Sequence, residues 1–467
     1  MQVIPQGMEI PFALVALFWM GLVSYFVRRG NIDPMKLLAF NIWVTALCGS
    51  ALTILRRVEP GGLSTTVLMG GTAIIMFTFL ATALAGGGKG APNKGLVIIT
   101  LALTAVEVYF LSAHSAGIAA SIPEVLALTF LPGIVIQIRN SGASRERLLR
   151  LSAYVTTFVV YGSVILGFVA PALAYSQGFA DHRRIDILGL TWRLGGFTPH
   201  PNFLSVTALM CIVLVLALKL RFRGVTAIVC LLAIGLAESR NAMVTLVVVA
   251  AVAWVCKGKT FALRASVATP LSVALVMASG SLESDATALT SDIATNGRFR
   301  IWDLVVENFN NDPLNGFGPL AFQPESGSPM LAAGLLHAHN QILQGIAEGG
   351  VLGGALTVAL LFALLRIGIK HRREVIYPSM VVIFLLSVPT EPFLTLHLYG
   401  LNYAVLPAFL MFVVLMSADA RSDSPEPVSV VEEERRLSLP DHLANPSAST
   451  LRALGLVDAH DQPGARH

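Results

Sequence analysis

The stretch of sequence that decides the fold runs from Asn202 to Lys219 and reads NFLSVTALMCIVLVLALK. It has no charged side chain before its last residue. A helix of about 20 apolar residues can cross the hydrocarbon core of a bilayer, where the backbone must satisfy its own hydrogen bonds. The stretch therefore predicts a transmembrane helix.

Similar apolar runs recur along the chain, and by hydropathy we expect about 12–13 transmembrane helices. The runs cover 11–27, 35–55, 64–85, 95–113, 117–138, 151–175, 202–219, 224–238, 241–256, 261–280, 342–366, 375–396 and 403–416. The predicted fold is an all-α polytopic membrane protein embedded in a lipid bilayer.

The composition agrees with a membrane protein. Hydrophobic residues make up 55% of the chain and charged residues 13%, whereas soluble domains have about 25% charged residues. The net charge of +4 is modest, and the basic residues are scattered between apolar runs. This pattern argues against nucleic-acid binding.

Basic residues gather in alternate loops, which sets the predicted orientation. If the N-terminus lies outside, the basic clusters near Arg28, Lys94, Arg150, Arg221 and Arg372 all fall on the inner side, as the positive-inside rule requires. Two longer loops, at about 176–201 and 281–340, then face outward. The tail at 417–467 is polar, and we expect it to be disordered in the cytoplasm.

The outward-facing segments carry the polar residues that suit chemistry. One segment, from Arg193 to Asn202, reads RLGGFTPHPN, and a second, from Glu238 to Ala242, reads ESRNA. Arginine offers a planar fork of donors suited to phosphate. Arginines here could hold a pyrophosphate leaving group and stabilise the charge that develops on it.

Two further outward segments supply a histidine and a set of glycines. The segment from Asn296 to Gly318 reads NGRFRIWDLVVENFNNDPLNGFG, and His337 to Gln341 reads HAHNQ before a helix that runs through Glu348-Gly349-Gly350. A histidine can accept a proton from a sugar hydroxyl near neutral pH. His339 is therefore the candidate base.

Together these segments resemble the O-antigen ligase/polymerase superfamily, which includes O-antigen ligases, O-antigen and exopolysaccharide polymerases and protein O-oligosaccharyltransferases. The most specific part is the run Gly-Arg-x-x-Ile-Trp…Pro-Leu-x-Gly-x-Gly…His-Asn…Glu-Gly-Gly-x-x-Gly. The resemblance spans about Arg193 to Gly354. It implies a polytopic glycosyltransferase domain over 1–416, with a ligase-like core at about 193–366.

The resemblance also implies the reaction and its partners. It suggests a metal-independent inverting glycosyltransferase without cofactors, at the periplasmic face of the bacterial inner membrane. The donor would be an undecaprenyl-diphosphate-linked glycan, and the acceptor a glycan or lipid A–core. The expected site residues are His339 as base, Arg193, Arg240 and Arg298 on the diphosphate, and His337, His200, Asn340, Gly350 and Glu391 in support.

Two expectations about local geometry follow from helical periodicity. On one continuous helix, His339 and Gly350 would share a face, about 20° apart and roughly 16 Å along the axis, and Gly350 would leave space for substrate. The segment from Arg298 to Phe309 is amphipathic, which predicts a helix on the outer membrane surface with Trp302 at the interface.

Alternative functions stay open at this point. We favour a polymerase over an O-antigen ligase because of the His-Ala-His-Asn run and the compact second loop. A transporter or flippase of lipid-linked glycan is the alternative of another class, although we see no internal repeat. Convergence of Arg193, Arg240 and His339 on one outer cavity would favour the enzyme, and dispersal would favour transport.

Overall fold

The computed structural model of the chain describes residues 25, 29, 33–58, 94–114, 136, 138, 144–176, 193–255, 298–318, 321–322, 338–391 and 405–418. The chain divides into two units, Met1–Arg421 and Ser422–His467, and the described residues all lie in the first. The spans predicted at 64–85 and 261–280, nearly all of 11–27 and 117–138, the tail beyond residue 418, and His337 lie outside them.

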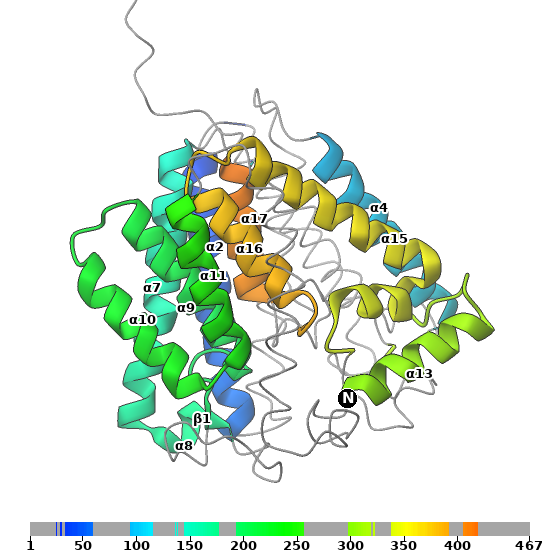
Figure 1. The fold of residues 1–467 in the computed structure, drawn as a ribbon, viewed down its shortest axis with the longest axis horizontal. Coiled ribbons are helices and arrows are strands. Elements are labelled where there is room, and N and C mark those ends of the chain that lie inside the picture. Colours follow the sequence, from blue (N-terminus) through cyan, green and yellow to red (C-terminus); the bar gives the residue numbers. More distant parts are fainter. Residues whose placement is uncertain are drawn as a thin grey trace, which may run out of the picture. The chain divides into compact units, whose positions relative to one another are not determined.

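Helices dominate the described residues, which confirms the predicted helical fold (Figure 1). In chain order they are α2 (Pro34–Val58), α4 (Lys94–His114), α7 (Arg145–Val169), α8 (Pro171–Ala174), α9 (Pro201–Ala217), α10 (Arg223–Ala237), α11 (Arg240–Val255), α13 (Arg298–Asn311), α15 (Gln341–Lys370), α16 (Ile376–Ser387) and α17 (Val405–Ser417). A short antiparallel pair, β1 (Tyr175–Ser176) with β2 (Arg193–Leu194), joins α8 to the first outward segment.

Among the described residues, α7 and α15 are long and apolar enough to cross a membrane. α7 has 25 residues and α15 has 30. Shorter apolar helices, including α9, α10, α11 and α16, lie below that length. The described chain thus contains apolar helices of membrane-spanning length.

α9 forms the centre of the bundle. It packs against α7, α10, α11 and α16, and nearly all its side chains are buried. A helix that is hydrophobic all round belongs inside a larger assembly or a membrane. Its hydroxyls bond back to the helix, as when Thr207 Oγ1 donates to the carbonyl of Phe203 at 2.8 Å, so their burial leaves no donor unsatisfied.

α10 presents the opposite kind of surface. Its side chains at Val225, Ile228 and Leu231 are exposed, and its other face, which includes Cys230 and Ile234, is buried. Exposed apolar patches of this kind mark surfaces made for another apolar partner. A lipid environment would cover this face of α10.

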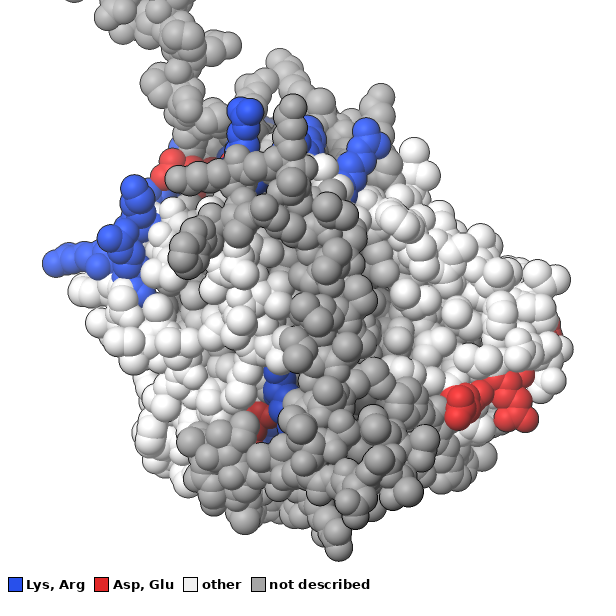
Figure 2. Space-filling view, viewed as in Figure 1, with Lys and Arg blue, Asp and Glu red and all other residues white. Residues whose placement is uncertain are grey.

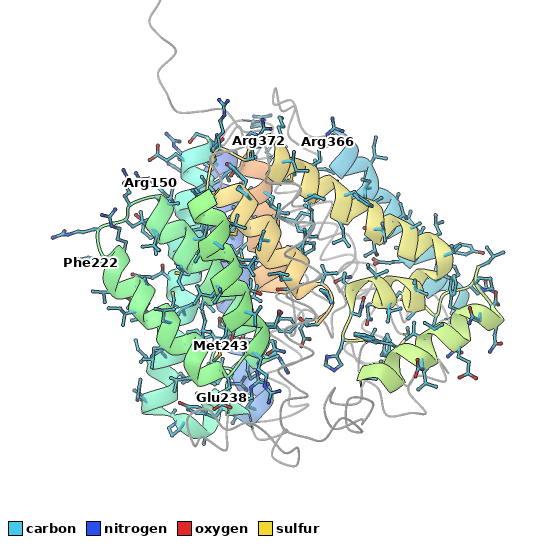
Figure 3. The ribbon with its side chains drawn as sticks, viewed as in Figure 1. Arg150, Phe222, Glu238, Met243, Arg366 and Arg372 are labelled. Atoms are coloured by element: carbon cyan, nitrogen blue, oxygen red, sulfur yellow. The ribbon has the colours of Figure 1, made fainter. Side chains whose placement is uncertain are left out.

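Charge separates toward the ends of the bundle. Figure 3 places Arg150, Arg366 and Arg372 at one end and Glu238 at the other, and Lys and Arg gather along the first of these ends in Figure 2. The ion pair between Arg145 of α7 and Glu374, in the turn before α16, also joins elements at the basic end. The basic residues that gather in alternate loops of the sequence therefore gather at one end of the folded bundle.

The continuous helix predicted from His339 to Gly350 is wrong. α15 begins at Gln341, after His339, and it breaks at Gly349 (φ −126°, ψ 17°) and Gly350 (φ 56°, ψ −151°). The two arms then fold against each other, since a Cβ on Gly353 would lie 2.3 Å from the carbonyl oxygen of Gly345. Periodicity along one axis does not apply across such a break.

Candidate active site

Arg193 occupies β2 and ties the first outward segment to the end of α10. Its Nε donates to the carbonyl of Ala237 at 2.8 Å, and its Nη2 donates to the carbonyl of Glu238 at 3.2 Å. Nη2 also donates to Asn202 Oδ1 at 2.9 Å. A cation is favourable beside the exposed carbonyls of a helix C-terminus, so Arg193 holds the second outward segment in place.

A glycine turn carries the chain from Arg193 to α9. Gly196 has a positive φ of 56°, and a Cβ there would lie 2.2 Å from the Cβ of Ser163. His200 is the N-cap of α9, and its Nδ1 accepts from the backbone N–H of Asn202 at 3.2 Å. The structure thus gives His200 a capping role at the start of α9, with Pro201 in the first turn.

Arg240 begins α11, two residues after the left-handed C-cap Glu238 (φ 46°). Its side chain is half-buried. The next residue, Asn241, donates from Nδ2 to Thr390 Oγ1 at 2.9 Å. The second outward segment is therefore anchored to the chain that follows α16.

Glu391, just after α16, contacts two of the outward segments. Its Oε1 accepts from Asn202 Nδ2 at 2.6 Å, and its Oε2 lies 3.6 Å from His339 Nδ1. The Glu391 side chain is 3% exposed and that of His339 is 24% exposed. A carboxylate this buried is costly unless it is paired, and here a neutral donor and an imidazole face it.

His339 sits at the start of α15 in a backbone conformation that few residues adopt. Its φ is 48°, a region in which non-glycine residues are uncommon and often functional. Asn340 caps α15, because its Oδ1 accepts from the N–H groups of Ile342 and Leu343. The N–H of Gln341 donates to the carbonyl of Val388 at 2.9 Å, which fixes this turn to the end of α16.

Trp302 of α13 holds the residue before His339. Its Nε1 donates to the carbonyl of Ala338 at 3.0 Å, while the N–H of Ala338 donates to Gln344 Oε1 at 2.8 Å. The amphipathic helix is confirmed as α13, with Ile301 and Val305 buried. The Trp302 indole donates to the protein backbone, and its position at the membrane interface stays a prediction.

The glycine-rich motif at 313–318 packs on the break in α15. The N–H of Phe317 donates to the carbonyl of Ala347 at 2.9 Å, and that of Val351 donates to the carbonyl of Pro313 at 2.8 Å. A Cβ on Gly350 would lie 2.8 Å from the carbonyl oxygen of Leu314. The expectation that Gly350 leaves space for substrate is wrong, since backbone fills that space.

The sequence of one part of this assembly matches a known family. The family model described as O-antigen ligase matches residues 225–358. This match supports the resemblance to the O-antigen ligase superfamily that the sequence motifs indicated. No curated protein sequence matches the chain. The family is one of bacterial membrane proteins that act in polysaccharide biosynthesis, and its members are ligases and polymerases.

The O-antigen ligase match covers only part of the site. It includes Arg240, His339 and Gly350, and it leaves out Arg193, Asn202 and Glu391. The residues outside the match reach His339 through the hydrogen bonds from Arg193 to Asn202 and from Asn202 to Glu391. The backbone of Arg298 begins α13, and its side chain is not among the parts that the structure describes.

Arg57 of α2 also supports the candidate site, although the sequence around it did not point to that role. Its Nη1 donates to the carbonyls of Leu173 and Gly196, at 2.5 and 2.8 Å, and its Nη2 donates to that of Thr198 at 2.8 Å. These contacts brace the turn that follows Arg193. The only sequence signal was an Arg-Arg pair at the outer end of an apolar run, which bears on the orientation alone.

Proposed function

We propose that the protein is an inner-membrane glycosyltransferase that transfers or polymerises glycan from an undecaprenyl-diphosphate-linked donor at the periplasmic face, in O-antigen or exopolysaccharide biosynthesis. The observation that carries the proposal is the meeting of three outward segments at the end of α16. Asn202 and His339 face Glu391, and Asn241 bonds Thr390. The family match supports this reading.

In the proposed reaction, an acceptor hydroxyl attacks the anomeric carbon of the donor sugar in one displacement, which inverts its configuration. His339 takes the hydroxyl proton as the new C–O bond forms. The bond between the anomeric carbon and the diphosphate oxygen breaks, and undecaprenyl diphosphate leaves with the electron pair. Arg240, Arg193 and Arg298 stabilise its charge without a metal ion.

The charge distribution supports the proposed orientation. The bundle end with Arg150, Arg366 and Arg372 would face the cytoplasm, and the end with Glu238 would face the periplasm (Figure 3). We propose about 12–13 transmembrane helices within 1–416, with the ligase-like core at 193–366. The loop at 281–340 would be periplasmic, and the tail at 417–467 cytoplasmic.

Polymerase and ligase differ in the acceptor. A polymerase transfers the growing chain to another lipid-linked repeat, and a ligase transfers it to lipid A–core. We keep the polymerase as the first candidate because of the His-Ala-His-Asn run. The ligase is the second candidate, favoured by the description of the family whose model matches.

The arrangement of the outward segments favours an enzyme over a transporter. Hydrogen bonds connect Arg193 through Asn202 to Glu391, which faces His339, and the residue after Arg240 bonds Thr390. Residues of a transport pathway are expected near the bilayer midplane, between repeats. These residues gather instead at helix ends and in turns.

The test is the glycan profile of a strain that lacks the gene, rescued by the wild type or by His339→Ala. Surface polysaccharide and the polyprenyl-linked pool are measured together. Single repeats on the carrier with long chains lost would establish the polymerase, and long chains stranded on the carrier would establish the ligase. An unchanged profile in both pools, or full rescue by His339→Ala, would overturn the proposal.

A further inference from the structure

The chain that follows α16 gathers segments that are far apart in the sequence. Val388 accepts from the N–H of Gln341 beside His339, and Thr390 accepts from Asn241 beside Arg240. Glu391 accepts from Asn202 at 2.6 Å. This turn, 388–391, lies outside the family match at 225–358. It is therefore a separate part of the chain that sets the mutual position of the candidate site residues.

Glu391 is the charged residue of the turn 388–391. One carboxylate oxygen is fixed by Asn202, whose own Oδ1 accepts from Arg193. The amide of Asn202 is thereby used on both sides, which fixes its orientation and that of the carboxylate. The second oxygen lies 3.6 Å from His339 Nδ1, beyond a hydrogen bond but within an electrostatic contact.

We propose that Glu391 is the positioning residue for His339. Its carboxylate directs Nδ1 inward, so that Nε2 is the atom presented to the acceptor hydroxyl, and it stabilises the imidazolium formed when His339 takes the proton. A buried carboxylate beside an imidazole nitrogen does the same work in hydrolytic triads. Such contacts often shorten only when substrates are bound.

The two hydrogen bonds of Asn202 also connect Glu391 to Arg193. Arg193 and Glu391 contact opposite ends of one amide, so the arginine proposed for the donor diphosphate and the carboxylate behind the base share one rigid support. A side chain locked by neighbours in this way keeps a reacting group within the small tolerance that catalysis requires. Asn202 thus supports both the arginine proposed to bind the donor diphosphate and the carboxylate proposed to position the base for the acceptor.

This inference rests on the proposed function, and the test separates the two. The full-length protein is purified as wild type, Glu391→Gln, Glu391→Asp and His339→Ala, with Glu146→Gln as a matched control because Glu146 is an exposed acid at the start of α7. Turnover of lipid-linked glycan and binding of undecaprenyl diphosphate are both measured. Glu391→Gln should lower kcat roughly 10- to 100-fold with undecaprenyl diphosphate binding retained, and Glu391→Asp should recover part of the loss.

The remaining outcomes overturn either the positioning role of Glu391 or the proposed function. Normal turnover in Glu391→Gln, with His339→Ala inactive, overturns the positioning role and leaves the proposed function standing. Loss of undecaprenyl diphosphate binding together with turnover in both Glu391 variants, or failure of both to fold, marks a purely structural residue and also overturns it. Full activity in His339→Ala overturns the proposed function itself.

Discussion

Two clusters in this protein each contain an arginine, a histidine and a glutamate, and they differ in almost everything else. At one end of the bundle, the His339 cluster contains Arg193, Asn202, His339 and Glu391. Its carboxylate is 3% exposed and its histidine has a positive φ. Its members come from β2, from α9, from the residue before the N-cap of α15 and from the residues after α16.

At the basic end, the His371 cluster contains Arg145, His371, Glu374 and Tyr377. Arg145 pairs with Glu374 and lies over the Tyr377 ring, 4.8 Å from its centroid, and His371 Nδ1 lies 3.2 Å from Glu374 Oε1. The Glu374 side chain is 39% exposed, so water screens its charge. An arginine, a histidine and a glutamate therefore do not make a site; burial, backbone strain and the joining of distant segments distinguish the first cluster.

The largest expected difference between the two clusters comes from removing each histidine in turn. His339→Ala should lower turnover by about 10²- to 10⁴-fold, the usual contribution of a general base, while the protein still reaches the membrane. His371→Ala should keep turnover within about twofold, because a helix-end histidine away from the site contributes little to a barrier. Steady-state kinetics on the full-length proteins measures both, and equal losses would mean that the two clusters are not different in kind.

The break in α15 offers the next largest effect. Gly350 has φ 56° and ψ −151°, and a Cβ would press on the carbonyl of Leu314. Gly350→Ala should lower the free energy of unfolding by about 1–3 kcal/mol through strain alone. Gly235→Ala, inside α10, is the control, since no atom lies within 4 Å of the position that a Cβ would take there, and alanine favours a helix by up to about 1 kcal/mol over glycine.

Thermal unfolding in detergent compares the two glycine variants. A lower midpoint for Gly350→Ala and an unchanged or higher midpoint for Gly235→Ala are expected. Equal midpoints would show that the 313–318 motif does not clamp the break.

The sequence predicted the helices better than it predicted the contacts between them. Apolar runs such as 202–219 and 241–256 lie within a residue or two of α9 and α11, because a backbone in an apolar setting has few alternatives to a helix. The break in α15 was not predictable from periodicity. It depends on Gly350 meeting the backbone of Pro313 and Leu314, a contact between separate segments.

The sequence predicted which residue types form the candidate site, but it predicted only in part which residues contact one another there. His339 and Arg193 stood out because charged or titratable side chains at the ends of apolar runs are few. Glu391 was predicted as a supporting residue and Asn202 as part of the first outward segment, but nothing in the sequence pointed to the contact between the two residues, which are 189 positions apart. The Arg-Arg pair that contains Arg57 gave no indication of this role, because the partners of Arg57 are backbone carbonyls that the fold brings to it.

A third prediction concerns the support of the His339 cluster by α13. Trp302→Phe keeps an aromatic ring and removes the Nε1–H that donates to Ala338. A hydrogen bond of this kind contributes about 0.5–1.5 kcal/mol, so turnover should fall by roughly two- to tenfold with undecaprenyl diphosphate binding retained. Trp43→Phe, at an edge-to-face contact with Phe158, is the matched control, and an equal loss there would point to general loosening of the bundle.

The smallest expected effect comes from a change in the His371 cluster, which tests whether that cluster contributes to stability alone. Arg145→Gln removes the ion pair with Glu374 and the cation–π contact with Tyr377. Because Glu374 is partly exposed, the combined loss should be about 1 kcal/mol in the free energy of unfolding, with turnover unchanged; unfolding midpoints and kinetics on one preparation measure both. A strong loss of turnover without a loss of stability would mean that the basic end communicates with the His339 cluster along α16 and the turn 388–391, which together join Tyr377 to Glu391.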